Sequence, residues 1–184
     1  TGEGYIPSIY KKYDVVISLM GCRASLSPWY ERGGMNPADE NDVPVFEGRF
    51  NMGAISLHLP MILAKSRAEN KDFYEVLDYY LEMIRGLHKK TYEYLAEKKA
   101  STNPLGFCQG GFLGGHLNPD DNIGPLLAPM TMSFGITALN ELQVLYNGKS
   151  LVEDGQFAIE VMEYINKKAA EYKETDHILY AIYG

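Results

Sequence analysis

Hydrophobic and polar positions alternate between strand-like and helix-like stretches along this chain. Residues 13–20 are rich in β-branched and apolar side chains, which is typical of a buried strand. The pattern also predicts strands over residues 45–59, 130–135 and 177–183. A short helix is expected over residues 61–66, directly after the strand predicted for residues 45–59.

Helical periodicity is strongest over residues 70–99, where apolar side chains recur at three- and four-residue spacing. This spacing predicts one long amphipathic helix, and His88, which precedes two lysines, is interpreted as a solvated residue of that helix. Further helices are expected from Asn118 onward, over residues 136–146, and from about residue 150 to residue 173.

Strands that alternate with helices favour an α/β sheet or barrel with parallel strands. At 184 residues the chain is one domain of ordinary size or a piece of a larger one. Residues 24–44 are rich in proline and glycine and are expected to form a long loop. The glycines of residues 105–115 match neither the dinucleotide fingerprint nor the P-loop, so we interpret them as shaping turns.

Composition narrows the classes of partner. The chain has 17 Lys plus Arg against 24 Asp plus Glu, and its net charge of −7 argues against a duplex nucleic-acid surface. A phosphate-bearing small ligand stays compatible, because backbone N–H groups at helix N-termini bind phosphate. Two cysteines make no disulfide framework, and no apolar run approaches transmembrane length, so a cytoplasmic compartment without membrane contact is the simplest expectation.

Cys22 is the first candidate for chemistry. It follows the predicted strand and Gly21, which allows a tight turn that holds a thiol out from the strand end. The alternative is an inert cysteine packed as a small hydrophobe. Cys108 and His116 lack further ligands at metal-site spacing, so no metal site is proposed for them.

The second candidate is the predicted strand–turn–helix unit of residues 130–146. On this interpretation Ser133, Gly135 and the following amides lie at a helix N-terminus, where they could bind phosphate. The alternative is an ordinary helix start with no ligand.

Three segments carry a resemblance to one family: Met20-Gly21-Cys22-Arg23, residues 48–60 and residues 133–142. They resemble the anaerobic, class III ribonucleoside-triphosphate reductases, which are glycyl-radical enzymes. The resemblance implies an α/β fold that is part, about half, of a ten-stranded barrel, with a finger loop that carries a cysteine. Residues 1–184 would then be one fragment of the catalytic barrel domain.

The resemblance also implies roles for individual residues. Cys22 matches the loop cysteine that becomes a thiyl radical and abstracts the 3′-hydrogen of the ribose. Asn51 would face the ribose hydroxyls, and an amide at that place points to the branch that uses formate as reductant. Met20 would line the substrate pocket, and the strand-to-helix turn with Thr131, Ser133, Gly135 and Ile136 would hold substrate phosphates.

The remaining family features are expected outside this sequence. They are the glycyl radical, installed by an iron–sulfur, S-adenosylmethionine activase, the four-cysteine zinc site, the ATP-cone and the first half-barrel. The implied partners are a ribonucleoside triphosphate, the activase and a second copy in a homodimer. The fragment alone is expected to be inactive.

Two alternatives stay open at this point. Another glycyl-radical enzyme, similar to the formate lyases, is expected to have adjacent cysteines at the loop tip, which Met20-Gly21-Cys22-Arg23 does not show. The other alternative is a non-catalytic α/β binding or assembly module in which Cys22 is only packed.

Overall fold

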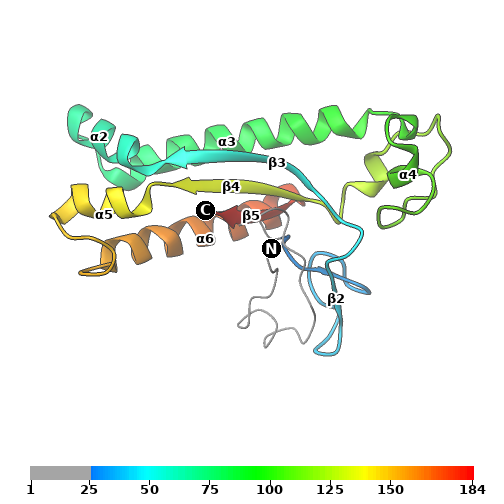
Figure 1. Ribbon diagram of the computed structural model, residues 1–184, viewed down its shortest axis with the longest axis horizontal. Coiled ribbons are helices and arrows are strands. Elements are labelled where there is room, and N and C mark those ends of the chain that lie inside the picture. Colours follow the sequence, from blue (N-terminus) through cyan, green and yellow to red (C-terminus); the bar gives the residue numbers. More distant parts are fainter. Residues whose placement is uncertain (1–25) are drawn as a thin grey trace.

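A three-stranded parallel sheet is the centre of the computed structural model, which describes residues 26–184 (Figure 1). Its strands are β3 (Asn51–His58), β4 (Thr131–Thr137) and β5 (Leu179–Tyr183), with β4 in the middle. The predicted mixed α/β architecture with parallel strands is confirmed, as one part of an α/β domain. The predicted strand over residues 13–20, with Met20 and Cys22 at its end, lies outside the described residues.

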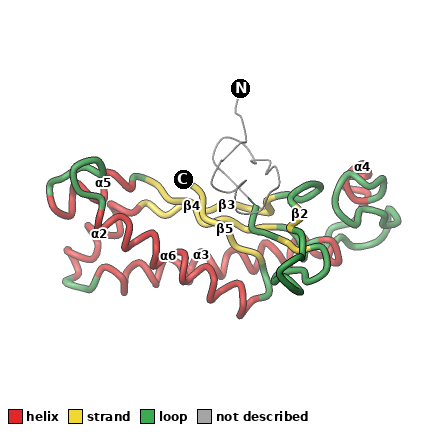
Figure 2. Tube along the Cα trace, turned by 90° about the horizontal axis from the view of Figure 1, so that it is seen from below, coloured by secondary structure: helices red, strands yellow, loops and turns green. Residues whose placement is uncertain are grey.

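The long helices lie on one side of this sheet. In Figure 2 both α3 (Phe73–Ala96) and α6 (Gln156–Asp176) run beneath the strands. The helices α2 (Leu59–Glu69) and α5 (Leu139–Asn147) follow β3 and β4 at the end where these strands finish, and the short α4 (Pro104–Phe107) lies at the opposite end (Figure 1). None of the helices within residues 26–184 is both long and apolar enough to cross a membrane.

The predicted loop of residues 24–44 contains more structure than its composition indicates. The strands β1 (Trp29–Tyr30) and β2 (Pro44–Val45) pair antiparallel, and the loop between them folds around Asp42. The Asp42 carboxylate accepts hydrogen bonds from three backbone N–H groups, those of Arg32, Gly33 and Ala38. Burial opposes ionisation of Asp42, but these N–H groups outweigh it, so the pKa of Asp42 is lowered.

Three predicted boundaries are wrong. The strand expected over residues 45–59 is broken by a turn at Gly48, whose φ of 66° suits glycine, and β3 begins only at Asn51. No α-helix starts at Asn118, because the Asp121 carboxylate accepts the Asn118 N–H and closes a turn instead. The helix expected from residue 136 begins at Leu139, since β4 continues as far as Thr137.

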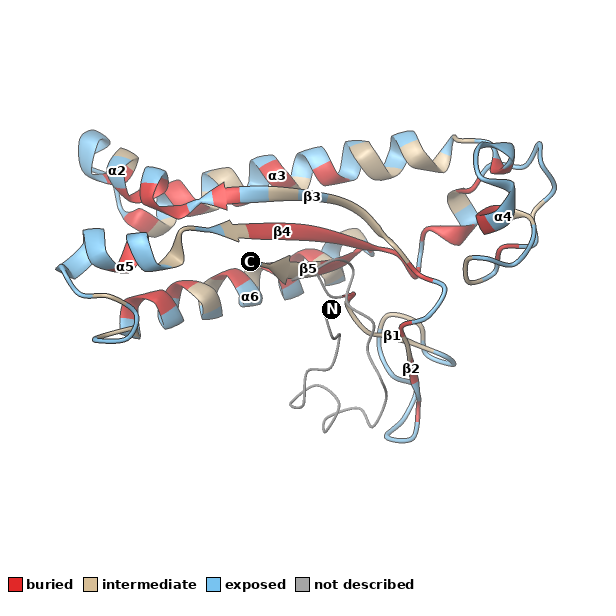
Figure 3. Ribbon diagram, viewed as in Figure 1, coloured by how far each residue is buried: buried red, intermediate tan, exposed pale blue. Residues whose placement is uncertain are grey.

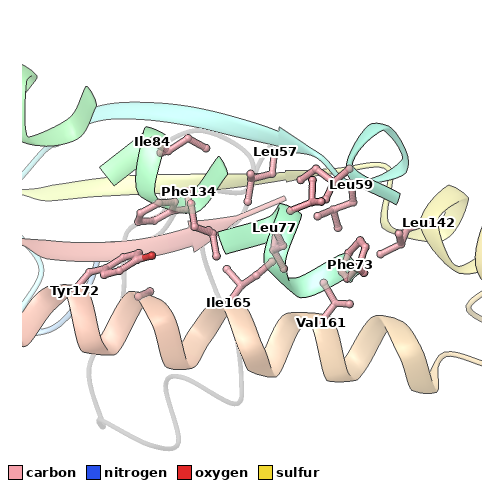
Figure 4. Close-up of a cluster of buried hydrophobic side chains, with 14 of the residues drawn as sticks. Leu57, Leu59, Phe73, Leu77, Ile84, Phe134, Leu142, Val161, Ile165 and Tyr172 are labelled. Atoms are coloured by element: carbon pink, nitrogen blue, oxygen red, sulfur yellow. The ribbon is translucent and has the colours of Figure 1, made fainter. Parts of the chain in front are cut away.

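The core lies between the sheet and its helices (Figure 4). It is built from apolar side chains of several elements, among them Leu57, Phe73, Leu77, Ile84, Phe134, Val161, Ile165 and Tyr172. Figure 3 shows that β4 is buried along most of its length, as expected for the central strand of a parallel sheet.

His88 belongs to this core, so its interpretation as a solvated residue is wrong. It is only 1% exposed, and its Nε2 lies 3.1 Å from the carbonyl oxygen of Ser133. The ring meets Phe134 edge-on, with 5.2 Å between ring centroids. His88 continues the buried face that runs through Leu81 and Ile84, which outweighs its two lysine neighbours. Burial lowers the pKa of His88, which keeps the imidazole neutral near pH 7.

Strand register sets which side chains share the other face of the sheet. Ser56, Gly135 and Tyr183 pair across the three strands and form one row. A Cβ atom on Gly135 would collide with Ser56 Oγ and lie 2.8 Å from the Tyr183 ring. This row therefore requires glycine because of close packing, not because of an unusual φ angle.

An ion cluster joins the helices beneath the sheet. Arg85 of α3 donates two hydrogen bonds of 2.7 Å to the Asp176 carboxylate at the end of α6. Lys89 Nζ and the Tyr180 hydroxyl reach the same carboxylate at 3.2 and 3.0 Å. The hydrogen bonds from Arg85 lower the pKa of Asp176 to about 2, against the opposing effect of burial.

This cluster predicts an acid-dependent contribution to stability. The pKa of Asp176 is about 2 in the folded chain, below its unfolded value, so the contribution is present above pH ~4 and is lost as the pH falls toward 2. We expect Asp176→Asn to lower the free energy of unfolding of the full-length protein by about 2 kcal/mol at neutral pH. Chemical denaturation between pH 2 and pH 7 measures this.

The matched control is Glu82→Gln, because Glu82 also pairs with Arg85 but its side chain is 53% exposed. Its effect should stay below about 1 kcal/mol, as for other surface ion pairs. An Asp176→Asn profile that runs parallel to wild type between pH 4 and pH 2 would contradict the assignment.

The glycine row gives a second prediction. Gly135→Ala should lower the free energy of unfolding by about 1–3 kcal/mol, because the new methyl group has to displace Ser56 and Tyr183. The matched control is Gly86→Ala in the middle of α3, where an added Cβ meets nothing within 4 Å. That change should raise helix stability by about 1 kcal/mol. Thermal unfolding of the two variants compares them, and equal shifts in the same direction would refute the packing argument.

Candidate functional site

The side of the sheet that faces away from α3 and α6 carries small and polar side chains, and we call it the polar face. Along β4 the side chains alternate, so that Met132 and Phe134 enter the core while their neighbours point to the polar face. The polar side chains of this face are those of Asn51, Ser56, Thr131, Ser133 and Tyr183. The intervening residues Ala54, Gly135 and Ala181 are small, and Gly135 is closely covered by Ser56 and Tyr183.

Asn51 is held at a fixed orientation at the start of β3. Its Nδ2 donates to the hydroxyl of Ser133, and its Oδ1 accepts the Gly53 N–H at 2.9 Å. The second bond lies at the register shift between Asn51 and Gly53, where β3 bulges against β4. The amide is half-buried, and its bonds to other residues of 26–184 use one of its two N–H groups and one of its two oxygen lone pairs.

Ser133 connects the two faces of the sheet. It is fully buried, and its hydroxyl accepts from Asn51 on the polar face. Its carbonyl oxygen accepts from His88, which reaches it from α3. His88 therefore fixes the Ser133 backbone from the core side, and this also fixes the hydroxyl group that accepts from Asn51.

Thr131 lies one row nearer the start of the strands. Its Oγ1 accepts the backbone N–H of Ser27 at 3.3 Å, and the Ser27 hydroxyl donates to the carbonyl of Tyr180. Thr131 thus anchors the chain that precedes β1 to the sheet.

Tyr183 and Ser56 form a further polar pair at the carboxyl ends of the strands, with their hydroxyl oxygens 3.0 Å apart. The sequence did not indicate either residue as part of a site. The alternation of residues 177–183 indicates that Tyr183 shares a face with Ala181, but only the strand register shows that this face is also that of Asn51.

The structure brings together some of the predicted site residues and separates others. Asn51 and Ser133 are in contact, and Gly135 lies one row further along the same face. Ile136 packs against the core on the opposite face. Met20 and Cys22 lie outside the described residues.

The prediction that Thr131, Ser133, Gly135 and Ile136 form a strand-to-helix turn is wrong. Thr131, Ser133, Gly135 and Ile136 all lie within β4, and the turn comes after them, with Ala138 as the N-cap of α5. A hollow of about 670 Å³ lies at this junction. Ala138, Leu139, Asn140 and Tyr183 are among the residues that line it.

The groups that the polar face offers to a ligand are amides and hydroxyls, so they act through hydrogen bonds. Within residues 26–184 no three His, Cys, Asp or Glu side chains gather in a group able to hold a metal ion. Cys108 packs against a second apolar cluster, which includes Phe107 and Leu127 and reaches the starts of β3 and β4.

Comparison with known proteins identifies the family whose sequences this chain matches. Residues 4–184 match the family of anaerobic ribonucleoside-triphosphate reductases. The enzyme of that name from Escherichia coli K12 is 26% identical over 185 residues, which covers 94% of this chain and 25% of the relative. The enzyme from Salmonella typhimurium is 25% identical with the same coverage, and that from bacteriophage T4 is 25% identical over 92% of this chain and 26% of the relative.

The chain therefore spans about a quarter of the length of the curated relatives it matches. The family match nevertheless runs over almost all of its own residues, including both Cys22 and the strands of the polar face. The chain belongs to the family of anaerobic ribonucleoside-triphosphate reductases.

Proposed function

We propose that the full-length protein reduces ribonucleoside triphosphates to 2′-deoxyribonucleoside triphosphates, and that this chain forms about half of its catalytic barrel. The observation that carries the proposal is the family match over residues 4–184. The polar face supports it, because its fixed amide and its hydroxyl groups suit a ligand rich in hydroxyl groups.

Cys22 is the proposed hydrogen-atom carrier. As a thiyl radical, its sulfur takes the hydrogen atom from C3′ of the ribose and becomes a thiol, which leaves the unpaired electron on the sugar. A glycyl radical elsewhere in the full-length protein, installed by an iron–sulfur, S-adenosylmethionine activase, is the proposed source of the radical. A site that excludes water protects such an intermediate from side reactions.

Asn51 is the proposed contact to the ribose hydroxyls. Its amide carries both donor and acceptor groups, does not titrate, and is held by Ser133 and by the Gly53 N–H. An amide here, in place of an acid, favours formate as the reductant. Met20 is proposed to line the pocket beside Cys22.

The substrate phosphates are proposed to extend from Asn51 toward the carboxyl ends of the strands. Ligands of open α/β sheets bind beyond the carboxyl ends of the strands. On this path lie Ser133, Gly135 and the Ser56–Tyr183 pair, followed by the backbone of Ile136 and the hollow at the start of α5. Thr131 contributes indirectly, through its bond to Ser27.

The proposal extends to the setting of the full-length protein. It comprises a cytoplasmic enzyme that forms a homodimer and is activated by its radical-generating partner.

The radical assignment predicts the effect of removing one sulfur atom. In the activated full-length protein, Cys22→Ser should abolish ribonucleotide reduction while the glycyl-radical signal in electron paramagnetic resonance still forms. A serine O–H bond is too strong to give up its hydrogen atom to the glycyl radical. The matched control is Cys108→Ser, which changes the other cysteine of the chain and should retain turnover. Turnover by Cys22→Ser at the wild-type rate would contradict the assignment of Cys22 as the hydrogen-atom carrier.

The ribose assignment predicts a smaller effect at Asn51. Asn51→Ala should lower kcat/KM roughly tenfold or more, because one lost hydrogen bond of 1–2 kcal/mol corresponds to about that factor. The matched control is Asn122→Ala, which removes an exposed amide from the loop that pairs with Lys99, away from the polar face. Steady-state kinetics with a ribonucleoside triphosphate measures both, and equal values for the two variants would remove Asn51 from the site.

A further inference from the structure

Arg49 is an unusual residue because it is a buried cation. It is only 4% exposed, and none of the ion pairs found within residues 26–184 includes it. Its guanidinium instead donates to three backbone carbonyls. Nε reaches Pro129 at 2.5 Å, Nη1 reaches Val45 at 2.6 Å and Nη2 reaches Ser27 at 2.7 Å.

These carbonyls belong to three segments that are distant in the sequence. Ser27 precedes β1, Val45 is in β2, and Pro129 lies just before β4. A single planar side chain therefore fixes the hairpin and the start of the central strand relative to each other. Lysine could not replace it, since its single nitrogen cannot match this fork of donors.

The same arrangement fixes Asn51, which follows Arg49 by two residues. Between them, the Phe50 N–H reaches the Met130 sulfur at 3.3 Å, and the Phe50 carbonyl accepts the Thr131 N–H at 3.2 Å. Arg49 is thus a buried residue at the point where β3 and β4 begin to pair. The Asn51–Ser133 contact is the next one along the two strands.

Ser27 extends this junction toward the polar face. Besides its carbonyl bond to Arg49, it donates its N–H to Thr131 and its hydroxyl to the Tyr180 carbonyl. Ser27 follows Cys22 by five positions in the sequence. Arg49 therefore holds both Asn51 and Ser27 near the start of β4.

Burial of a charge without a carboxylate partner is costly for folding. It lowers the pKa of Arg49 to about 10, so the group keeps its charge at neutral pH. An apolar side chain would fill the space without this cost, but it would leave three carbonyls without a donor. Only the guanidinium, with its fork of donors, can fix the positions of all three segments relative to one another.

We propose that Arg49 is a positioning residue for the proposed reduction, which holds Asn51 and the Ser27 end of the cysteine segment in register for the same ribose. The inference rests on the proposed function and adds to it a residue that does not touch the substrate.

Steady-state kinetics of the full-length protein tests the proposal with Arg49→Met and Arg49→Lys. Misplacement of reacting groups by about 1 Å costs up to about a hundredfold in rate, so kcat should fall about 10- to 100-fold in both variants. KM for the triphosphate should change by less than about threefold, because the phosphate contacts lie at the other end of the polar face.

The matched control is Arg85→Met. Arg85 also makes its main contacts with a buried partner, Asp176, but on the helix side of the sheet. At a temperature where all variants are folded, it should keep kcat within about twofold of wild type. A kcat of Arg49→Met equal to that of Arg85→Met, or full turnover by Arg49→Lys, would overturn the positioning role.

Hydrogen–deuterium exchange gives a second readout that does not depend on turnover. Peptides over residues 26–30 and 49–53 should exchange faster in Arg49→Met but not in Arg85→Met. Unchanged exchange in Arg49→Met overturns the inference.

The two failures are distinguishable. If the activated wild-type protein does not reduce ribonucleotides, the proposed function fails and the role of Arg49 in it fails too. If wild type turns over and Asn51→Ala is impaired while Arg49→Met is not, only the present inference fails.

Discussion

The pairing of β4 with strands on both sides is the constraint on which the rest of this structure depends. Side chains of a strand alternate between its faces, so a shift of one residue would send Ser133 into the core and Phe134 onto the polar face. The register is fixed from both faces. Phe134 fits among aromatic rings of the core, while Gly135 is the residue that the close approach of Ser56 and Tyr183 permits. Both the core and the candidate site follow from this one alignment.

The two faces of the sheet are also coupled chemically. On the helix side, Asp176 stays ionised because Arg85 and Lys89 surround it, and its accepted bond from Tyr180 fixes the neighbouring strand. His88 is different, because burial keeps its imidazole neutral and lets it donate a hydrogen bond to the Ser133 carbonyl. A charged group at that place would meet the apolar ring of Phe134. The core thus supplies a fixed but uncharged support for Ser133, while Arg85 and Lys89 of α3 pair with Asp176 at the end of α6.

The sequence was informative where the pattern itself carries the physical cause. The long helix around Leu77 and Ile84 and the strand at Phe134 follow from periodicity, and the family followed from short segments around Cys22 and Asn51. Pattern failed where a distant contact decides the local structure. His88 is buried because of where α3 lies on the sheet, and β4 extends to Thr137 because His58 pairs with it. The Ser56–Tyr183 pair joins residues 127 positions apart, which no local signal reports.

A site made of amides and hydroxyls that already have partners suits the chemistry proposed for it. Radical steps move hydrogen atoms, so the protein needs to fix distances more than it needs to supply a charged acid or base. Groups that are oriented before the substrate arrives do not reorganise during the reaction, which is the main way in which polar sites lower barriers. Asn51 is oriented by Ser133, Ser133 is supported by His88, and the start of both strands is held by Arg49. In the proposed function, the buried cation and the buried imidazole share one role, which is to support a neutral face without placing a charge on it.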